Sequence, residues 1–269
     1  MPDLLIVRIL RVVLFIVGCA AILAFVAPFA RQFPGKESEV FLGVTTSVAT
    51  FALTALFVRW EHLRLADVGA MPDAKSIGRL ALGVLIGTLA IAAWAGISIV
   101  AGQTWWARAN EIDVWPIVIA VLAYLCLACR EELAFRGFPL RRLHHVLGLW
   151  PAQLFVAVVF ALEHRLAGAT WIDAMLGAGV GSLLFGMAAI ATEGLAVPIG
   201  IHAAWNAGHW ALGLKGTPGI WTVVIDRNHG PGSPFIGIIL YDVVMLSATL
   251  AFWLWHRRQS GRGAITSCG

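Results

Sequence analysis

Side chains that could do chemistry gather in three short motifs in the second half of the sequence. The motifs read EELAFR at residues 131–136, FALEH at residues 160–164 and HAAWN at residues 202–206. Each lies in or at the end of an apolar run, where carboxylates and imidazoles are costly and therefore indicate function. Carboxylate, imidazole and amide groups in one place are suited to the hydrolysis of an acyl bond.

The two adjacent carboxylates of the first motif are expected to play different roles. Neighbouring residues on a helix diverge by about 100°, so Glu131 and Glu132 cannot both face one cavity. Glu132 and Arg136 are four residues apart and are predicted to pair along one face. Glu131 has no cation three or four residues ahead of it, so we expect it to point elsewhere, free of a local counter-ion, as a general base.

Helix geometry also predicts that the first two motifs meet. Glu131 lies thirteen residues before His144, and His164 lies thirteen residues after Pro151. An antiparallel hairpin that turns between these points places both side chains at a depth of roughly 20 Å. A kink is expected in the first arm at Pro139, because proline cannot continue the helical hydrogen bonding.

The third motif adds hydrogen-bond donors. His202 and Asn206 are four residues apart and therefore present an imidazole and an amide on one helical face. His209 continues this face, and we expect it to cap the far end of the helix. In a shared cavity, Glu131 can take a proton from a water molecule that His164 orients. The imidazole and the amide of the third motif can then donate to the developing oxyanion.

The same side chains allow a second interpretation, a zinc site. Glu131, His164 and His202 would be the ligands, with a water molecule in the fourth position. The sequence contains no HExxH, whose helical spacing is the strong zinc signal. A reaction without any required cofactor is therefore favoured, and zinc dependence remains the alternative.

The elements that position these motifs are predicted to be transmembrane helices. Of the 269 residues, 59% are apolar and 13% are charged, against roughly half and a quarter in soluble domains. Spanning a bilayer takes about 20 mostly apolar residues per helix. The sequence therefore predicts an all-α, polytopic transmembrane bundle of about eight spans, forming a single domain over residues 1–269. The expected apolar segments cover about residues 4–29, 40–58 and 80–100, begin near 114 and 150, and cover 172–191, 195–214 and 236–255.

The charges favour one orientation and exclude one class of partner. The net charge of +4 is small and is not gathered in one stripe, so nucleic acid is not expected as a partner. With the N-terminus inside, thirteen lysines and arginines are internal and six are external, which favours both termini in the cytoplasm. The internal residues are Arg8, Arg11, Arg59, Arg64, Lys75, Arg79, Arg130, Arg136, Arg141, Arg142, Arg257, Arg258 and Arg262; the external ones are Arg31, Lys36, Arg108, Arg165, Lys215 and Arg227.

The three motifs, in this order and in separate helices, resemble those of one family. EELAFR, FALEH and HAAWN fit the patterns EExxxR, FxxxH and HxxxN/D of the CPBP family, the CAAX proteases and bacteriocin-processing enzymes also labelled Abi. The resemblance covers about residues 114–214, the expected catalytic core. It implies an eight-helix intramembrane endopeptidase similar to type II CAAX prenyl proteases. The roles that it implies are Glu131 as the base, His164 as its partner, His202 and Asn206 as oxyanion donors, and Glu132, Arg136 and Phe160 as supporting residues.

The resemblance leaves the substrate and one acidic residue unassigned. The expected partners are the lipid bilayer of the cytoplasmic membrane and a membrane-associated protein or peptide, which need not be prenylated. Glu163, beside His164, is not part of the motif and receives no role. The same intramembrane charges also suit a transporter or channel that relays protons, or a non-catalytic scaffold or immunity protein that keeps them for folding.

Overall fold

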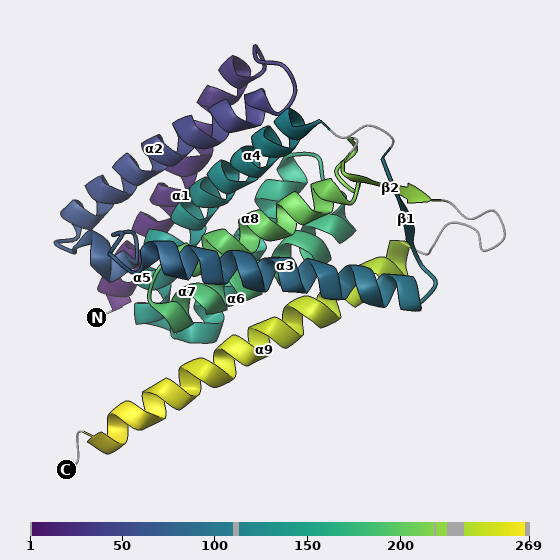
Figure 1. The fold of residues 1–269 in the computed structure, drawn as a ribbon. Coiled ribbons are helices and arrows are strands. Elements are labelled where there is room, and N and C mark those ends of the chain that lie inside the picture. The colour runs from purple at the N-terminus through teal and green to yellow at the C-terminus, as the bar shows by residue number, and fades with distance from the viewer. Residues whose placement is uncertain (1, 110–112, 218, 225–233, 267–269) are drawn as a thin grey trace.

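The computed structural model describes residues 2–109, 113–217, 219–224 and 234–266 (Figure 1). Arg227, one of the charges used for orientation, lies outside these residues. In the described ranges the chain is helical apart from turns and one two-stranded antiparallel sheet. The helices are α1 (Pro2–Ala30), α2 (Glu37–Trp60), α3 (Ser76–Val100), α4 (Val114–Glu132), α5 (Phe138–Leu147), α6 (Leu149–Leu166), α7 (Val180–Thr192), α8 (Ala196–Ala211) and α9 (Pro234–Thr266), with short helical turns η1 (Leu65–Val68), η2 (Leu133–Gly137) and η3 (Asp173–Gly179).

Most of these helices are suited to a lipid environment. Six segments of the described chain are long and apolar enough to cross a membrane: 5–30, 37–60, 76–100, 149–166, 173–192 and 235–259. Their large apolar side chains lie on the outside; Phe25, for example, is 71% exposed and Ile77 is 82% exposed. The chain is therefore an integral, multi-pass membrane protein, and the all-α fold class is confirmed.

Two of the eight predicted spans are not among these six, and both carry site motifs. α8 has 16 residues, fewer than a bilayer span needs. α4 ends in the charged residues Arg130, Glu131 and Glu132. α8 lies inside the bundle against α3, α4 and α7, and none of its residues is exposed. α4 packs against α2 and α8; protein covers Arg130 and Glu132 at its charged end, whereas Val114 and Trp115 in its first turn are exposed.

Glycines bring α8 close to its neighbour α3. A methyl group added at Gly83 would overlap the backbone carbonyl of Val197, and one at Gly200 would overlap the carbonyl of Leu80. Small residues at such positions let two helix backbones approach within van der Waals contact. The position of α8, and of the third motif on it, is therefore fixed by backbone contacts with α3.

The fourth segment is interrupted directly after the two carboxylates. η2 is a π-helical turn, and all five of its residues are buried. Pro139 at the start of α5 has no N–H to donate to the carbonyl four residues earlier, and Gly137 leaves the helical region with ψ −114°. Instead of a simple kink at Pro139, the chain therefore widens into a π turn and breaks at Gly137. Such turns often occur at functional sites.

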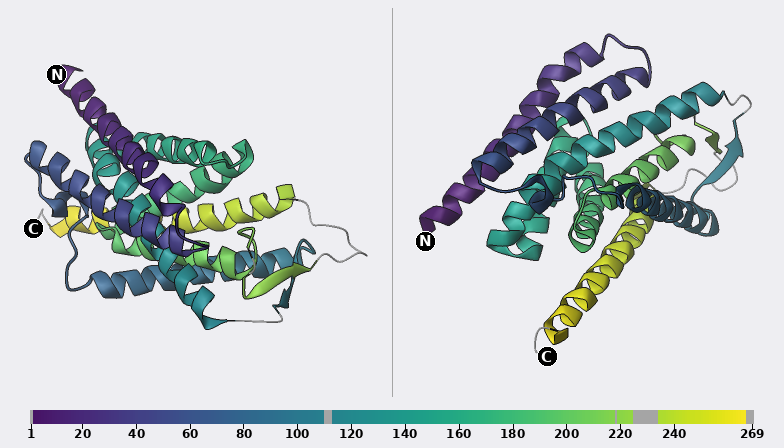
Figure 2. Two further views of the ribbon diagram at one scale, coloured as in Figure 1. Left: turned by 90° about the horizontal axis from the view of Figure 1, so that it is seen from above. Right: turned by 60° about the vertical axis from the view of Figure 1, so that its left-hand side comes forward.

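The bundle has two distinct ends, seen in all three views (Figures 1 and 2). Both chain termini lie at one end, called here the termini end. At the opposite end, β1 (Trp105–Arg108) pairs antiparallel with β2 (Trp221–Val224), which follows it by more than a hundred residues. Ion pairs join distant segments at the termini end: Glu61 binds Arg11 of α1 at 3.4 Å and also binds Arg142 of α5.

Candidate active site

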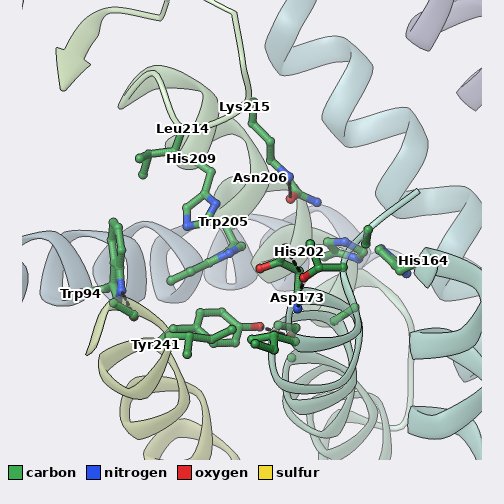
Figure 3. A pocket seen from close by; sticks show the side chains of 18 of the residues that line it. Trp94, His164, Asp173, His202, Trp205, Asn206, His209, Leu214, Lys215 and Tyr241 are labelled. Atoms are coloured by element: carbon green, nitrogen blue, oxygen red, sulfur yellow. Dashed lines mark hydrogen bonds between the residues drawn. The ribbon is translucent and has the colours of Figure 1, made fainter. Parts of the chain in front are cut away.

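A cavity of about 910 Å³ lies between α3, α6, η3, α7, α8 and α9. It contains His164 of the second motif and His202 and Asn206 of the third (Figure 3). Aromatic rings form part of its wall, Trp94 and Tyr241 among them. The three side chains converge because α6 and α8 both present their motif to this space, which gives a polar centre inside an apolar chamber.

Glu132 lies beside this cavity and is fully buried. Its Oε2 is 3.5 Å from Nε of Arg136, so the predicted pair along one helix face is present. Its Oε1 accepts a hydrogen bond from Nδ1 of His202 at 2.8 Å. Glu132 therefore holds both a buried arginine and the imidazole of the third motif, which makes it a residue that organises the site.

Arg136 shows why the second motif begins with phenylalanine. Its guanidinium carbon lies 4.5 Å from the centre of the Phe160 ring, and Nη2 donates to Oγ of Ser182 at 2.7 Å. A cation over an aromatic face in a desolvated site gains up to about 2 kcal/mol. Phe160 therefore supports the site by stabilising the cation that neutralises Glu132.

Glu131 is not free of a counter-ion, contrary to the prediction. Nη1 of Arg130 lies 3.8 Å from its Oε1, because the long arginine side chain bends back toward its neighbour. The other oxygen, Oε2, is buried, has no hydrogen-bond partner among the described residues, and lies 3.6 Å from Nε2 of His202. That gap is too long for a direct hydrogen bond, so this oxygen is an unpaired acceptor. Oε2 of Glu132 has no hydrogen bond either, but it faces the guanidinium of Arg136 at 3.5 Å.

The sequence did not assign Arg130 or Glu163, and the structure pairs them. Arg130 is only 3% exposed, and its Nη2 donates to Oε1 of Glu163 across α4 and α6. Glu163 is therefore the counter-ion of Arg130. The ion pair connects α4, directly before the first motif, with the second motif on α6. One signal in the sequence could have found it: an acid beside an intramembrane histidine needs a cation, and Arg130 had no predicted partner.

The two histidines are held by their Nδ1 atoms. Nδ1 of His164 lies 2.9 Å from the carbonyl of Phe160, and because a carbonyl only accepts, Nδ1 carries the proton. In a neutral ring this leaves Nε2 of His164 as an acceptor. His202 likewise gives its Nδ1 proton to Glu132 and stacks on the Phe185 ring with centres 4.3 Å apart. His164 also lies close enough to Glu131 to interact with its charge, as the hairpin geometry predicts.

Asn206 is oriented by Lys215, a residue that the sequence analysis did not connect with the site. Nζ of Lys215, in the loop after α8, donates to Oδ1 of Asn206 at 3.0 Å (Figure 3). This contact assigns the amide and leaves Nδ2 of Asn206 free to donate. The lysine side chain is exposed within the cavity, yet the surrounding protein desolvates its ammonium group and lowers the pKa of Lys215, an effect that Glu131 partly offsets.

His209 faces the cavity rather than only capping α8, which corrects the expectation for this residue. Its ring packs against Trp205 and Trp94, with centres 4.9 and 5.4 Å away. The residue therefore belongs to the aromatic wall.

Glu131, His164 and His202, the possible zinc ligands, are not arranged as a metal site. Among the residues that the structure describes, no group of three or more His, Cys, Asp or Glu side chains is placed to hold a metal ion. His164 and His202 each keep Nε2 available, while Glu131 offers a single unpaired oxygen. The donor atoms are thus of the right kind for zinc, but their present arrangement does not form a ligand set.

Comparison with known families agrees with the motifs. Residues 113–208, about a third of the chain, match the family model described as type II CAAX prenyl endopeptidase Rce1-like. No curated protein matches the chain. The matched stretch contains α4 to α8 up to residue 208, and with them all three motifs. Residues 113–208 of this membrane protein are therefore an Rce1-like domain of the type II CAAX prenyl endopeptidase (CPBP) family.

Proposed function

We propose that the chain is an intramembrane endopeptidase that cleaves a membrane-associated protein or peptide with a water molecule activated by Glu131. The observation that carries this proposal is the buried Oε2 of Glu131, which has no hydrogen-bond partner among the described residues and lies 3.6 Å from Nε2 of His202, one of the two motif imidazoles that line the cavity. A buried polar atom without a partner requires an explanation, and a general base supplies one.

Activation of water follows from the acceptors that the site offers. A water molecule can donate one proton to Glu131 Oε2 and the other to Nε2 of His164, since both are acceptors. Its lone pairs are then directed away from both groups, toward a substrate carbonyl. As the oxygen bonds to the carbonyl carbon, its proton passes to Glu131. The C–N bond then breaks, and Glu131 returns the proton to the leaving amine.

Two side chains of α8 can stabilise the oxyanion. Asn206 donates through Nδ2, because Lys215 occupies its carbonyl oxygen. His202 already gives its Nδ1 proton to Glu132, so it donates through Nε2 only as an imidazolium. Besides its three carboxylates and two guanidiniums, the site holds the ammonium group of Lys215, whose positive charge lies beside the amide of Asn206. A cation next to this donor favours the negative charge that develops in the transition state.

The reaction is proposed to need no metal ion, and the substrate need not be prenylated. The test is incubation of the purified protein with a membrane-anchored peptide library, comparing the wild type with Glu131→Gln. This substitution keeps the shape of the side chain and removes the base, and the rate is expected to fall by about 10² to 10⁴. Glu39→Gln, the same chemical change in a partly exposed ion pair with Lys36, is the matched control and should cleave at the wild-type rate.

The experiment also separates this proposal from its alternatives. Equal cleavage by the wild type and a folded Glu131→Gln variant would contradict the assignment of the base. A folded wild-type protein that cleaves no member of the library would favour a scaffold or a transporter, and proton or solute flux in proteoliposomes would then distinguish these two.

A further inference from the structure

Lys215 lines the cavity without a carboxylate in contact with it. Its Nζ donates to Oδ1 of Asn206 at 3.0 Å, and this is the one hydrogen bond that the described residues give to the ammonium group. An ammonium group carries three N–H donors and no acceptor. Two donors of Lys215 therefore have no acceptor among the described residues, although the group borders the space in which a substrate would bind.

The carboxylates nearest to Lys215 are already paired with other cations. Glu131 and Glu39 both act on the charge of Lys215, but neither is in contact with it. Glu131 lies 3.8 Å from Arg130, and Glu39 lies 2.6 Å from Lys36. Lys36 also acts on Lys215, as a like charge. A desolvated cation without an anion in contact gains from any carboxylate that is brought to it, because charge-assisted hydrogen bonds are strong in such a site.

We propose that Lys215 binds an acidic side chain of the substrate, close to the bond that is cleaved. This inference rests on the proposed peptidase function and adds a substrate class to it: membrane-associated polypeptides with Asp or Glu beside the scissile bond. The acidic group would bind Lys215, and the scissile carbonyl would bind Asn206, whose amide oxygen is 3.0 Å from Nζ. Because an extended chain advances about 3.5 Å per residue, the acidic residue lies within about two residues of the cleaved bond.

The test uses pairs of membrane-anchored peptides, amidated at the C-terminus, that carry either Glu or Gln at one of the two positions on each side of the central bond. For the Glu peptide we expect a kcat/KM about ten to a hundred times higher, the gain from a hydrogen bond between charged groups. Lys215→Met should slow both peptides, through Asn206, and should also abolish the preference for Glu. Lys215→Arg keeps the charge and should keep the preference.

Asp173→Asn is the matched control. Asp173 also lines the cavity, on the other side of His202 from Lys215 (Figure 3). The substitution changes the charge of the cavity by one unit, as Lys215→Met does, but leaves the ammonium group in place. The preference for Glu should therefore persist in Asp173→Asn. Its loss there would mean that the overall charge of the cavity, rather than contact with Lys215, selects the substrate, and would overturn the inference.

Binding to an inactive variant makes the test independent of turnover. The Kd of the same peptides is measured for Glu131→Gln and for Glu131→Gln combined with Lys215→Met, and the Glu peptide should bind more tightly only to the first. Equal binding and equal cleavage of the Glu and Gln peptides would overturn the inference, as would a preference that survives Lys215→Met. A preference for a free C-terminal carboxylate without one for Glu would overturn the assignment to a side chain. If the Glu peptide binds through Lys215 and the wild type cleaves neither peptide, the acidic-side-chain site is supported and the peptidase function is contradicted.

Discussion

Glu132→Gln is expected to destabilise the protein strongly, and the cost follows from two contacts. The substitution removes the charge that faces Arg136 at 3.5 Å, in a pair whose two side chains are both 0% exposed. It also weakens the 2.8 Å hydrogen bond from His202. Breaking one partner of a buried ion pair costs about 3–5 kcal/mol, because the remaining charge stays buried without compensation. The ring of Phe160 and the hydroxyl of Ser182 remain near Arg136 and do not supply a negative charge.

The assay is thermal unfolding of purified variants in one detergent. At roughly 2–4 °C per kcal/mol for a chain of this size class, the loss corresponds to a melting temperature lowered by about 6 °C or more. Glu39→Gln is the matched control, because it removes the same charge from a shorter pair, 2.6 Å from Lys36, whose side chains are 19% and 32% exposed. Partly exposed pairs contribute about 0–1 kcal/mol, so this variant should melt close to the wild type.

A melting temperature for Glu132→Gln within about 2 °C of that of Glu39→Gln would refute this reasoning. It would mean that Arg136 finds another anion or reaches water, and that the buried pair does not hold the first motif in place. Glu131→Gln provides the complementary comparison. Oε2 of Glu131 has no hydrogen-bond partner among the described residues. Replacing this carboxylate should therefore lower the rate of peptide cleavage more than the melting temperature.

Three further predictions concern the amide, the helix contact and metal dependence. Lys215→Met should lower kcat, and this loss should vanish when Asn206→Ala is already present, because the lysine acts by orienting that amide; equal losses in both backgrounds would contradict this role. Gly83→Ala should destabilise by about 1–3 kcal/mol and reduce activity, because its methyl group forces α3 away from α8. Gly96→Ala in the same helix, where a methyl group meets nothing within 4 Å, should cost nothing in the same melting assay. Activity should survive dialysis against chelators, and a loss that zinc restores would establish the metal-dependent alternative.

Short-range geometry made part of the site predictable. The spacing of Glu132 and Arg136 predicts their pair, and the spacing of His202 and Asn206 predicts a shared face, because both relations lie within one helix. Six of the eight predicted spans were recognisable for a similar reason, since a bilayer demands length and apolarity from each helix separately. Each of these inferences needed no knowledge of how one helix packs on another.

Apart from the approach of His164 to Glu131, contacts between elements could not be predicted in this way. Arg130 and Glu163 are 33 residues apart, and only the packing of α4 against α6 brings them together. Lys215 reaches Asn206 from a loop whose path no periodicity specifies. The prediction that Glu131 lacks a counter-ion failed for another reason. The angle between neighbouring residues of a helix determines only the direction of each Cα–Cβ bond. The side chain of Arg130 is long enough to bend back and reach the carboxylate of Glu131.

The placing of the motifs on α4 and α8 has a physical reason. A helix that faces lipid over its whole length must be apolar, whereas a helix enclosed by other helices can carry charges if they are paired or line a cavity. α8 packs against α3, α4 and α7, and it carries three polar side chains, His202, Asn206 and His209, that lipid would not favour. The charged end of α4 likewise meets α8 and α6 rather than lipid. The two helices least able to span a bilayer alone, α4 and α8, therefore carry the proposed base and oxyanion donors, while α6, one of the six apolar spans, contributes His164.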